Sequence, residues 1–125
     1  MSTILANPQT APHVLAVNKT AADAITEVQL TLHVHRGLRW FDGHFPQVAL
    51  LPGVVQTTWV VEFARQYFSM PAQFRSMSNM KFMRFIMPDT QLTLWLRYVA
   101  EKGELSFEYR ESGKVCASGR VGFGP

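Results

Sequence analysis

The 125-residue chain predicts an α+β fold in which an antiparallel sheet wraps around one long central helix. Three observations predict it. Four stretches alternate apolar and polar residues with the period of two that is typical of half-buried strands. One stretch, Val54 to Phe68, is apolar over most of its length without alternation. Short turn sequences separate the later strands, which indicates antiparallel hairpins.

Composition favours a single globular domain that spans residues 1–125. Apolar residues make up 47% of the chain and charged residues 17%, and no apolar run is long enough to span a membrane. Cys116 is the single cysteine, which excludes an internal disulfide and favours a reducing cytoplasm. The net charge of +3 is mild and no nucleic-acid motif is present, so we expect no nucleic-acid partner.

The first predicted strand follows an irregular beginning. Residues 1–20 have no clean period, and we expect a loosely held lead-in with one short strand from His13 to Val17. The alternation from Val28 to Val34 then predicts a strand whose polar face carries His33 and His35. No nearby cysteine or carboxylate completes a ligand set for these histidines. We therefore expect them to face solvent, and expect neither a metal nor a cofactor.

The stretch from Val54 to Phe68 is rich in β-branched residues, which by propensity alone favour a strand. Its length, its lack of alternation and the stop signal at Ser69-Met70-Pro71 favour a helix instead. Because it is apolar almost all the way round, we expect burial on all sides. A helix of this kind requires a sheet around it.

Four strands are predicted after the helix. Residues 71–78 form a connection, and Asn79 to Met87 predicts a strand that is buried on both faces and contains a bulge. We interpret its methionines as core filling rather than as the wall of an acyl tunnel. The last three strands are Leu92–Val99, Leu105–Arg110 and Val115–Phe123.

The loop before the helix carries the candidate chemistry. His44 lies between Gly43 and Phe45-Pro46, and its imidazole suits proton transfer near neutral pH. Pro52-Gly53 stands at the start of the helix, where unpaired N–H groups and partial positive charge suit a developing oxyanion. Gly53 has no side chain to block a substrate carbonyl. His44 and Gly53 are therefore predicted catalytic residues.

The pair Gly43-His44-Phe45-Pro46 and Pro52-Gly53-Val54 resembles the signature of the hot-dog-fold 3-hydroxyacyl-acyl-carrier-protein dehydratases of the FabZ/FabA type. The run Leu50–Gln56 is most similar to the ApeI-like branch linked to aryl-polyene lipids, and the resemblance extends over Val28 to Phe123. It implies a hot-dog fold and an acyl thioester of acyl carrier protein or coenzyme A as substrate. It also implies a homodimer with sites formed between protomers, or a heteromer with another hot-dog subunit.

The chain departs from this family at Thr58, where the family carries a catalytic Glu or Asp on the helix. A hydroxyl does not titrate usefully. Glu62, one turn further, is either a displaced acid or the partner of Arg65. Asp42 or a partner subunit are the other sources of an acid.

The resemblance implies a β-elimination in which His44 removes a proton and the N–H of Gly53 polarises the thioester carbonyl. The candidate substrate-binding residues are Phe45, Pro52, Val54, Trp59 and Met83. Three hypotheses follow: a dehydratase with a rearranged acid, a non-catalytic acyl-thioester-binding partner subunit, or a thioesterase on the same fold.

Overall fold

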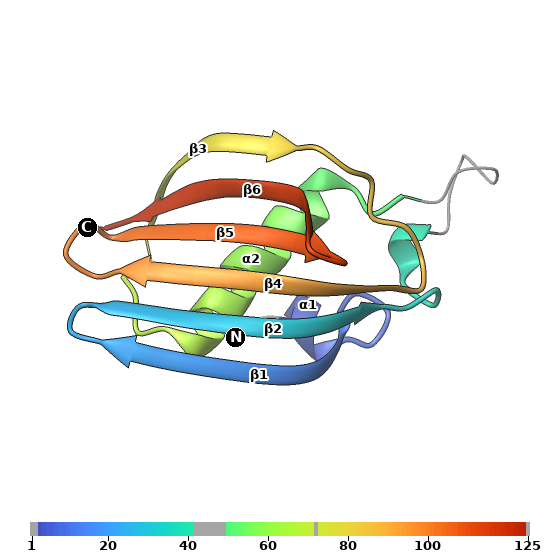
Figure 1. The fold of residues 1–125 in the computed structure, drawn as a ribbon, viewed down its shortest axis with the longest axis horizontal. Helices are drawn as coiled ribbons and strands as arrows, with labels where there is room; N and C mark the ends of the chain where they lie inside the picture. Colours follow the sequence, from blue (N-terminus) through green and yellow to red (C-terminus); the bar gives the residue numbers. More distant parts are fainter. Residues whose placement is uncertain (1–2, 42–49, 72, 125) are drawn as a thin grey trace.

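The computed structural model describes residues 3–41, 50–71 and 73–124. These form one sheet, one long helix, the short helix α1 (Thr3–Ala6) and the 3-10 helix η1 (Arg39–Phe41). Every strand pairing in the sheet is antiparallel, and the strand order is β1-β2-β4-β5-β6-β3. The strands are β1 (His13–Ala22), β2 (Ile25–Val34), β3 (Phe74–Phe82), β4 (Thr90–Val99), β5 (Glu104–Glu111) and β6 (Lys114–Phe123). The helix α2 (Gly53–Tyr67) crosses one face of the sheet (Figure 1). The predicted α+β architecture is confirmed.

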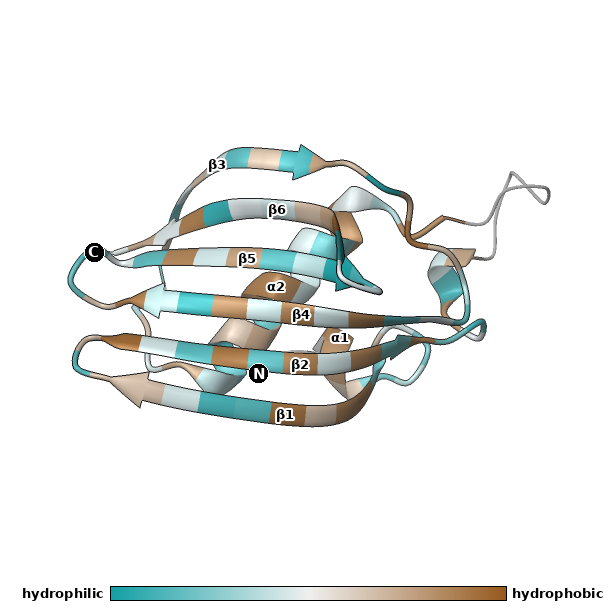
Figure 2. Ribbon diagram, viewed as in Figure 1, coloured by the Kyte–Doolittle hydropathy of each residue, from teal (hydrophilic) through white to brown (hydrophobic). Residues whose placement is uncertain are grey.

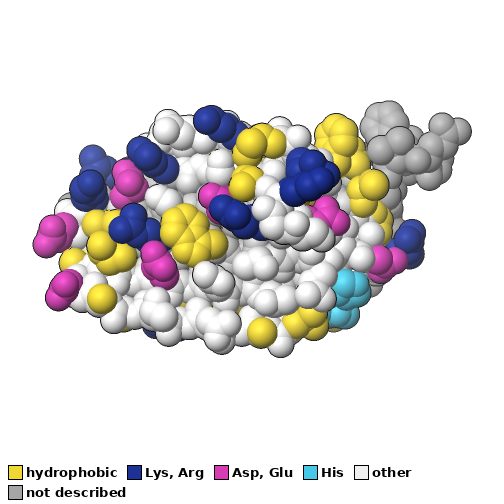
Figure 3. Space-filling view, viewed as in Figure 1, with side chains coloured by type: hydrophobic (Ala, Val, Ile, Leu, Met, Phe, Trp, Pro, Cys, Tyr) yellow, Lys and Arg dark blue, Asp and Glu magenta, His cyan; other side chains and the backbone are white. Residues whose placement is uncertain are grey.

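The core lies between the inner face of the sheet and α2. Along β4 every second residue is buried, from Thr90 to Tyr98, and the hydropathy bands of the central strands alternate in the same way (Figure 2). Burying each large apolar side chain contributes about 1.5–3 kcal/mol. The outer face of the sheet carries Lys, Arg, Asp and Glu side chains in a mixed pattern (Figure 3). This polarity difference between the two faces fixes the register of the central strands.

The predicted helix is confirmed, but its burial is one-sided. The buried residues are Val55, Gln56, Thr57, Trp59, Val60, Phe63 and Ala64. Val54 is 71% exposed, and Thr58 and Glu62, which follow it at helical spacing, are half-buried. The expectation of burial on all sides was wrong because the sheet covers only one side of α2. Within the described ranges, no helix is long and apolar enough to cross a membrane.

Strand β1 includes the second part of the segment that the sequence assigns to a loosely held lead-in, and it extends beyond the short strand predicted from His13 to Val17. It pairs with β2 from His13 to Ala22, and Lys19 donates a 2.8 Å hydrogen bond to the Tyr67 carbonyl at the end of α2. A cation there is favourable because the helix dipole is negative at that end. Every residue of β1 is exposed, so the strand has no buried positions to produce an alternating pattern.

Strand β3 differs from its prediction in both position and burial. It begins five residues earlier than expected, at Phe74, and ends at Phe82, and eight of its nine residues are exposed. It is an edge strand that, in the described sheet, pairs with β6. The expectation of burial on both faces was therefore wrong. The predicted bulge is present, because the register shifts between Ser78 and Lys81 around Asn79, whose φ is 55°.

The histidines of β1 and β2 form a group at one end of the sheet. His13 stacks on His35 with ring centroids 4.1 Å apart, and the Nε2 atom of His35 lies 2.9 Å from the Ala11 carbonyl oxygen. Desolvation, together with the charges of His35 and His33, lowers the pKa of His13. Among the residues that the structure describes, no three candidate ligands are arranged to hold a metal ion.

Candidate active site

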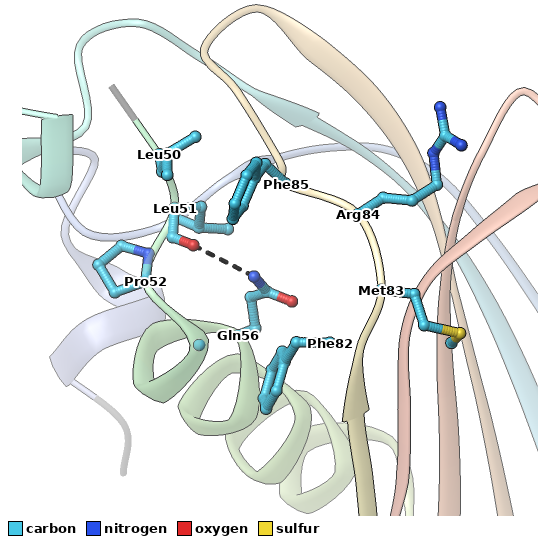
Figure 4. A pocket seen from close by; sticks show the side chains of 9 residues that line it. Leu50, Leu51, Pro52, Gln56, Phe82, Met83, Arg84 and Phe85 are labelled. Carbon is cyan, nitrogen blue, oxygen red and sulfur yellow. Dashed lines mark hydrogen bonds between the residues drawn. The ribbon is translucent and has the colours of Figure 1, made fainter. Parts of the chain in front are cut away.

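A largely apolar hollow of about 440 Å³ lies at the N-terminus of α2 (Figure 4). One wall is the start of α2 with the residues before it, and the other is the chain that leaves β3. The lining residues are Leu50, Leu51, Pro52, Gly53, Gln56, Phe82, Met83, Arg84 and Phe85. A concave apolar site with few polar groups suits an acyl chain.

Backbone hydrogen bonds hold the two walls in place. The N–H of Leu51 donates to the carbonyl of Ile86 over 2.8 Å, which ties the segment before α2 to the segment after β3. The N–H groups of Met83 and Arg84 both donate to the carbonyl of Cys116 on β6, over 2.8 and 3.1 Å. The hollow is therefore built on the sheet rather than on a free loop.

The residues Pro52 and Gly53 place the start of α2 in the wall of this hollow. The N–H groups of Val55 and Gln56 donate to the Pro52 carbonyl over 3.1 Å each. Within the described ranges, the N–H of Gly53 has no acceptor. A helix N-terminus carries partial positive charge, so this donor is suited to a substrate carbonyl oxygen.

Gly53 is favoured here by its close approach to the Phe82 ring rather than by its backbone angles. A Cβ atom on Gly53 would lie 3.2 Å from two carbon atoms of the Phe82 ring. This separation is tighter than an ordinary contact, so a side chain at position 53 would push the ring outward. Figure 4 shows Phe82 beside the first turn of the helix.

Gln56 places a buried amide in the hollow. Its side chain is 4% exposed, and its Nε2 group donates to the Leu51 carbonyl over 3.2 Å. Within the described ranges, its Oε1 atom has no hydrogen-bond partner. An unpaired buried acceptor costs about 1–3 kcal/mol. Gln56 was not among the predicted site residues, although a strongly polar side chain in the first turn of an apolar helix was a signal.

The predicted site residues separate into three groups. Pro52, Gly53 and Met83 line the hollow together. His44 and Phe45, like Asp42, lie outside the described residues. The other four predicted residues do not line it: Val54, Thr58, Trp59 and Glu62.

Trp59 belongs to the core instead. It is fully buried, and its indole N–H donates to the Thr10 carbonyl over 2.9 Å. The same carbonyl accepts a longer bond of 3.4 Å from Trp40. Trp59 therefore anchors the segment before β1 and does not line the hollow.

Thr58 and Glu62 lie on the less buried stripe of α2 that begins at Val54. The Thr58 hydroxyl donates to the carbonyl of Val54 over 2.7 Å, which is a local bond within the helix. Glu62 is nine residues beyond Gly53, which places it about 14 Å further along the helix axis. Within one chain, the Glu62 carboxylate is therefore far from the Gly53 N–H.

Comparisons with known proteins identify the family. The model of the family described as ApeI-like, ApeI dehydratase, matches residues 19–120. The chain belongs to the ApeI-like dehydratase family. A curated relative is the 3-hydroxyacyl-[acyl-carrier-protein] dehydratase FabZ of Streptococcus equi subsp. zooepidemicus (strain MGCS10565), 30% identical over 94 residues, which cover 67% of each protein.

Solved structures of similar proteins support this assignment. An uncharacterized protein from Erwinia carotovora subsp. atroseptica superposes with a TM-score of 0.83 and 34% identity, covering 91% of this chain and 96% of the other. The dehydratase heterocomplex ApeI:P from Xenorhabdus doucetiae superposes with a TM-score of 0.80 and 29% identity, covering 89% and 96%. The ApeI-like chain thus has the hot-dog fold that its sequence motifs imply.

Proposed function

We propose that the chain binds 3-hydroxyacyl thioesters in the hollow at the start of α2 and eliminates water from them. One observation carries the proposal: in a chain of the ApeI-like dehydratase family, the Gly53 N–H, which has no acceptor among the described residues, lies at a helix N-terminus that lines an apolar hollow. That combination suits a thioester whose carbonyl oxygen gains negative charge while its acyl chain is buried in the apolar hollow.

The reaction follows from these groups. His44 takes the proton from the carbon next to the thioester carbonyl, and the electron pair of that C–H bond moves toward the carbonyl oxygen. The N–H of Gly53 stabilises this oxygen, a role in which loss of one donor typically costs about 3–4 kcal/mol. The returning electron pair forms the double bond, the C–O bond to the 3-hydroxyl breaks, and the hydroxyl leaves as water after receiving a proton. The product is an enoyl thioester.

A second protomer is the most suitable source of the acid that protonates the leaving hydroxyl. Thr58 does not supply a titrating proton, and Glu62 of the same chain is about 14 Å along the helix from Gly53. The open stripe of α2 and the apolar edge at β3 are surfaces that a second protomer would cover. The exposed apolar residues at that edge are Phe74, Met77, Phe82, Met83, Phe85 and Met87.

We therefore propose a dimer in which the Glu62 carboxylate acts across the interface, with Asp42 as the alternative acid within the chain. The second protomer is another copy of this chain or a different hot-dog subunit. The neighbour from Xenorhabdus doucetiae is described as a dehydratase heterocomplex, which supports the heteromeric arrangement. The thioester carrier is acyl carrier protein or coenzyme A.

A second candidate function is a non-catalytic partner subunit that binds acyl thioesters. It is favoured by Thr58, whose hydroxyl bonds to its own helix at Val54 and provides no acid. General acid–base catalysis is typically worth 10²–10⁴-fold, so a site without an acid would bind substrate and turn it over poorly.

The test is an absorbance assay for the enoyl thioester with purified protein and a 3-hydroxyacyl thioester, with the His44→Ala variant as control. We expect interconversion that depends on His44. Binding of the thioester without conversion, at several chain lengths, would favour the partner-subunit function. Release of free thiol, detected with a thiol-reactive dye, would indicate a thioesterase and contradict both.

A further inference from the structure

The buried amide of Gln56 has a fixed orientation. The carbonyl oxygen of Leu51, 3.2 Å away, can only accept a hydrogen bond, so the Nε2 group of Gln56 must face it. The Oε1 atom is therefore on the opposite side of the amide, where the described residues offer it no donor. Figure 4 shows this oxygen pointing away from Leu51, toward the Met83 side of the hollow.

The position of Gln56 is fixed as firmly as its orientation. Its backbone carbonyl accepts a 2.6 Å hydrogen bond from the hydroxyl of Tyr109 on β5. Gln56 also follows Gly53 by three residues on α2, and residues at this spacing lie on the same face of a helix. The open N–H of Gly53 and the unpaired oxygen of Gln56 thus line the same hollow, one turn apart.

A ligand that binds the Gly53 N–H through its carbonyl therefore extends past Gln56. The carrier end of a thioester must lead out to solvent, whereas Gln56 is 4% exposed. The acyl end is the part that reaches the buried amide. In a 3-hydroxyacyl chain, the hydrogen-bond donor on this end is the hydroxyl group, two carbon atoms from the carbonyl carbon.

We propose that the Oε1 atom of Gln56 accepts a hydrogen bond from the 3-hydroxyl group of the thioester and so selects hydroxylated chains over saturated ones. This inference rests on the proposed function. It adds a residue that recognises the 3-hydroxyl group, which is the group to be eliminated. The enoyl product has no hydroxyl hydrogen to donate, so the same contact is lost when water leaves, which favours product release.

The hollow has side chains that can move to admit a ligand to this oxygen. The Oε1 atom is buried and has almost no surface exposed to solvent. Within one protomer, Phe82 and Phe85 at the mouth are 51% and 76% exposed, so rotating either ring disturbs little packing inside the chain. Opening the mouth would expose the oxygen to the acyl chain.

The experiment compares two ligands that differ only in the hydroxyl group. Octanoyl and 3-hydroxyoctanoyl chains are joined to pantetheine by an amide in place of the thioester, which prevents elimination during the measurement. Their dissociation constants are measured by calorimetry for the wild type and three variants. Gln56→Met removes the oxygen, Gln56→Glu keeps an acceptor at the same place, and Gln66→Met makes the same change at an exposed position of α2.

We expect the wild type and Gln66→Met to bind the hydroxylated ligand about tenfold more tightly. Gln56→Met should lose this preference, and Gln56→Glu should retain it. The loss of the bond to Leu51 affects both ligands alike and cancels in the ratio. If Gln56→Met does not fold, as judged by circular dichroism, the test uses the ratio of the two dissociation constants in the wild type and in Gln56→Glu.

The inference is overturned if the wild type binds both ligands equally, or if Gln56→Met keeps the preference. A Gln56→Met variant that weakens both ligands by the same factor keeps the preference, and would show that the oxygen does not distinguish the two ligands. Failure of the proposed function looks different: neither ligand binds, and no His44-dependent conversion occurs.

Discussion

The hydroxyl of Tyr109, on the central strand β5, donates a 2.6 Å hydrogen bond to the backbone carbonyl of Gln56 on α2. Tyr109 is fully buried, and the two residues are 53 positions apart in the sequence. The bond connects the inner face of the sheet to the first turns of the helix. The position of the hollow relative to the sheet therefore depends on a buried contact that lies behind it.

Replacing Tyr109 with Phe should lower the free energy of unfolding by about 1 kcal/mol, because one buried hydrogen bond is lost and the ring remains. Urea denaturation followed by circular dichroism measures this change. Tyr67→Phe, at the half-buried end of α2, is the matched control and should change stability by less. Equal effects of the two substitutions would contradict a specific role for the Tyr109 hydroxyl.

The same tyrosine should make the protein sensitive to alkali. Burial raises the pKa of Tyr109 well above its usual value of 10.0. Above about pH 10, the unfolded chain loses this proton while the folded chain keeps it, so stability falls as pH rises. One such group lowers the free energy of unfolding by about 1.4 kcal/mol per pH unit in this range. The stability difference between wild type and Tyr109→Phe should therefore shrink above pH 10, as urea titrations at several pH values would reveal.

Gly53→Ala should reduce dehydration by about tenfold or more while changing stability little. The new methyl group lies 3.2 Å from the Phe82 ring and crowds the N–H that is proposed to bind the substrate carbonyl. Alanine is also the better helix former, which offsets the strain. Initial rates of enoyl formation give the effect on activity. Adding Phe82→Ala, which makes room for the methyl group, should restore part of the lost rate. If the double variant instead shows the product of the two single-variant rate losses, a contact between the new methyl group and the Phe82 ring would be contradicted.

Trp59→Phe should cost about 2 kcal/mol of stability, because it removes the 2.9 Å bond to the Thr10 carbonyl and leaves a cavity. The loss should loosen the segment before β1. Hydrogen exchange of the Arg39 N–H, which donates to the Gln9 carbonyl, would report this. Trp40→Phe removes only the 3.4 Å bond to Thr10 and should have a smaller effect on both measurements.

Thr58→Asp should increase dehydration by about tenfold or more if the site lacks an acid, since general acid catalysis is worth 10²–10⁴-fold. The position is half-buried on the open stripe of α2, so a carboxylate there meets little steric resistance. Rates of enoyl formation are compared with those of Thr58→Asn, which has the same shape without an acid. Equal rates for the two variants would mean that another group already supplies the proton.

The central strands and the helix were predictable because burial of one face produces a periodic pattern of apolar residues in the sequence. Strands β2, β4, β5 and β6 alternate between core and surface, and their predicted positions are confirmed. The edge strands were not predictable in this way. Strands β1 and β3 are exposed along most of their length, so their sequences carry no alternation, and the start of β3 was placed five residues too late.

The sequence by itself determined the family and the helix start at Pro52-Gly53. Each of these depends on residues that are close together in the chain. The tertiary structure decided which of the predicted residues share a hollow, because that depends on how β3 packs against α2. It separated Trp59 from Gly53 and brought Phe82 and Met83 to the helix N-terminus. It also identified Gln56, because an unpaired buried oxygen can be recognised only when its surroundings are known.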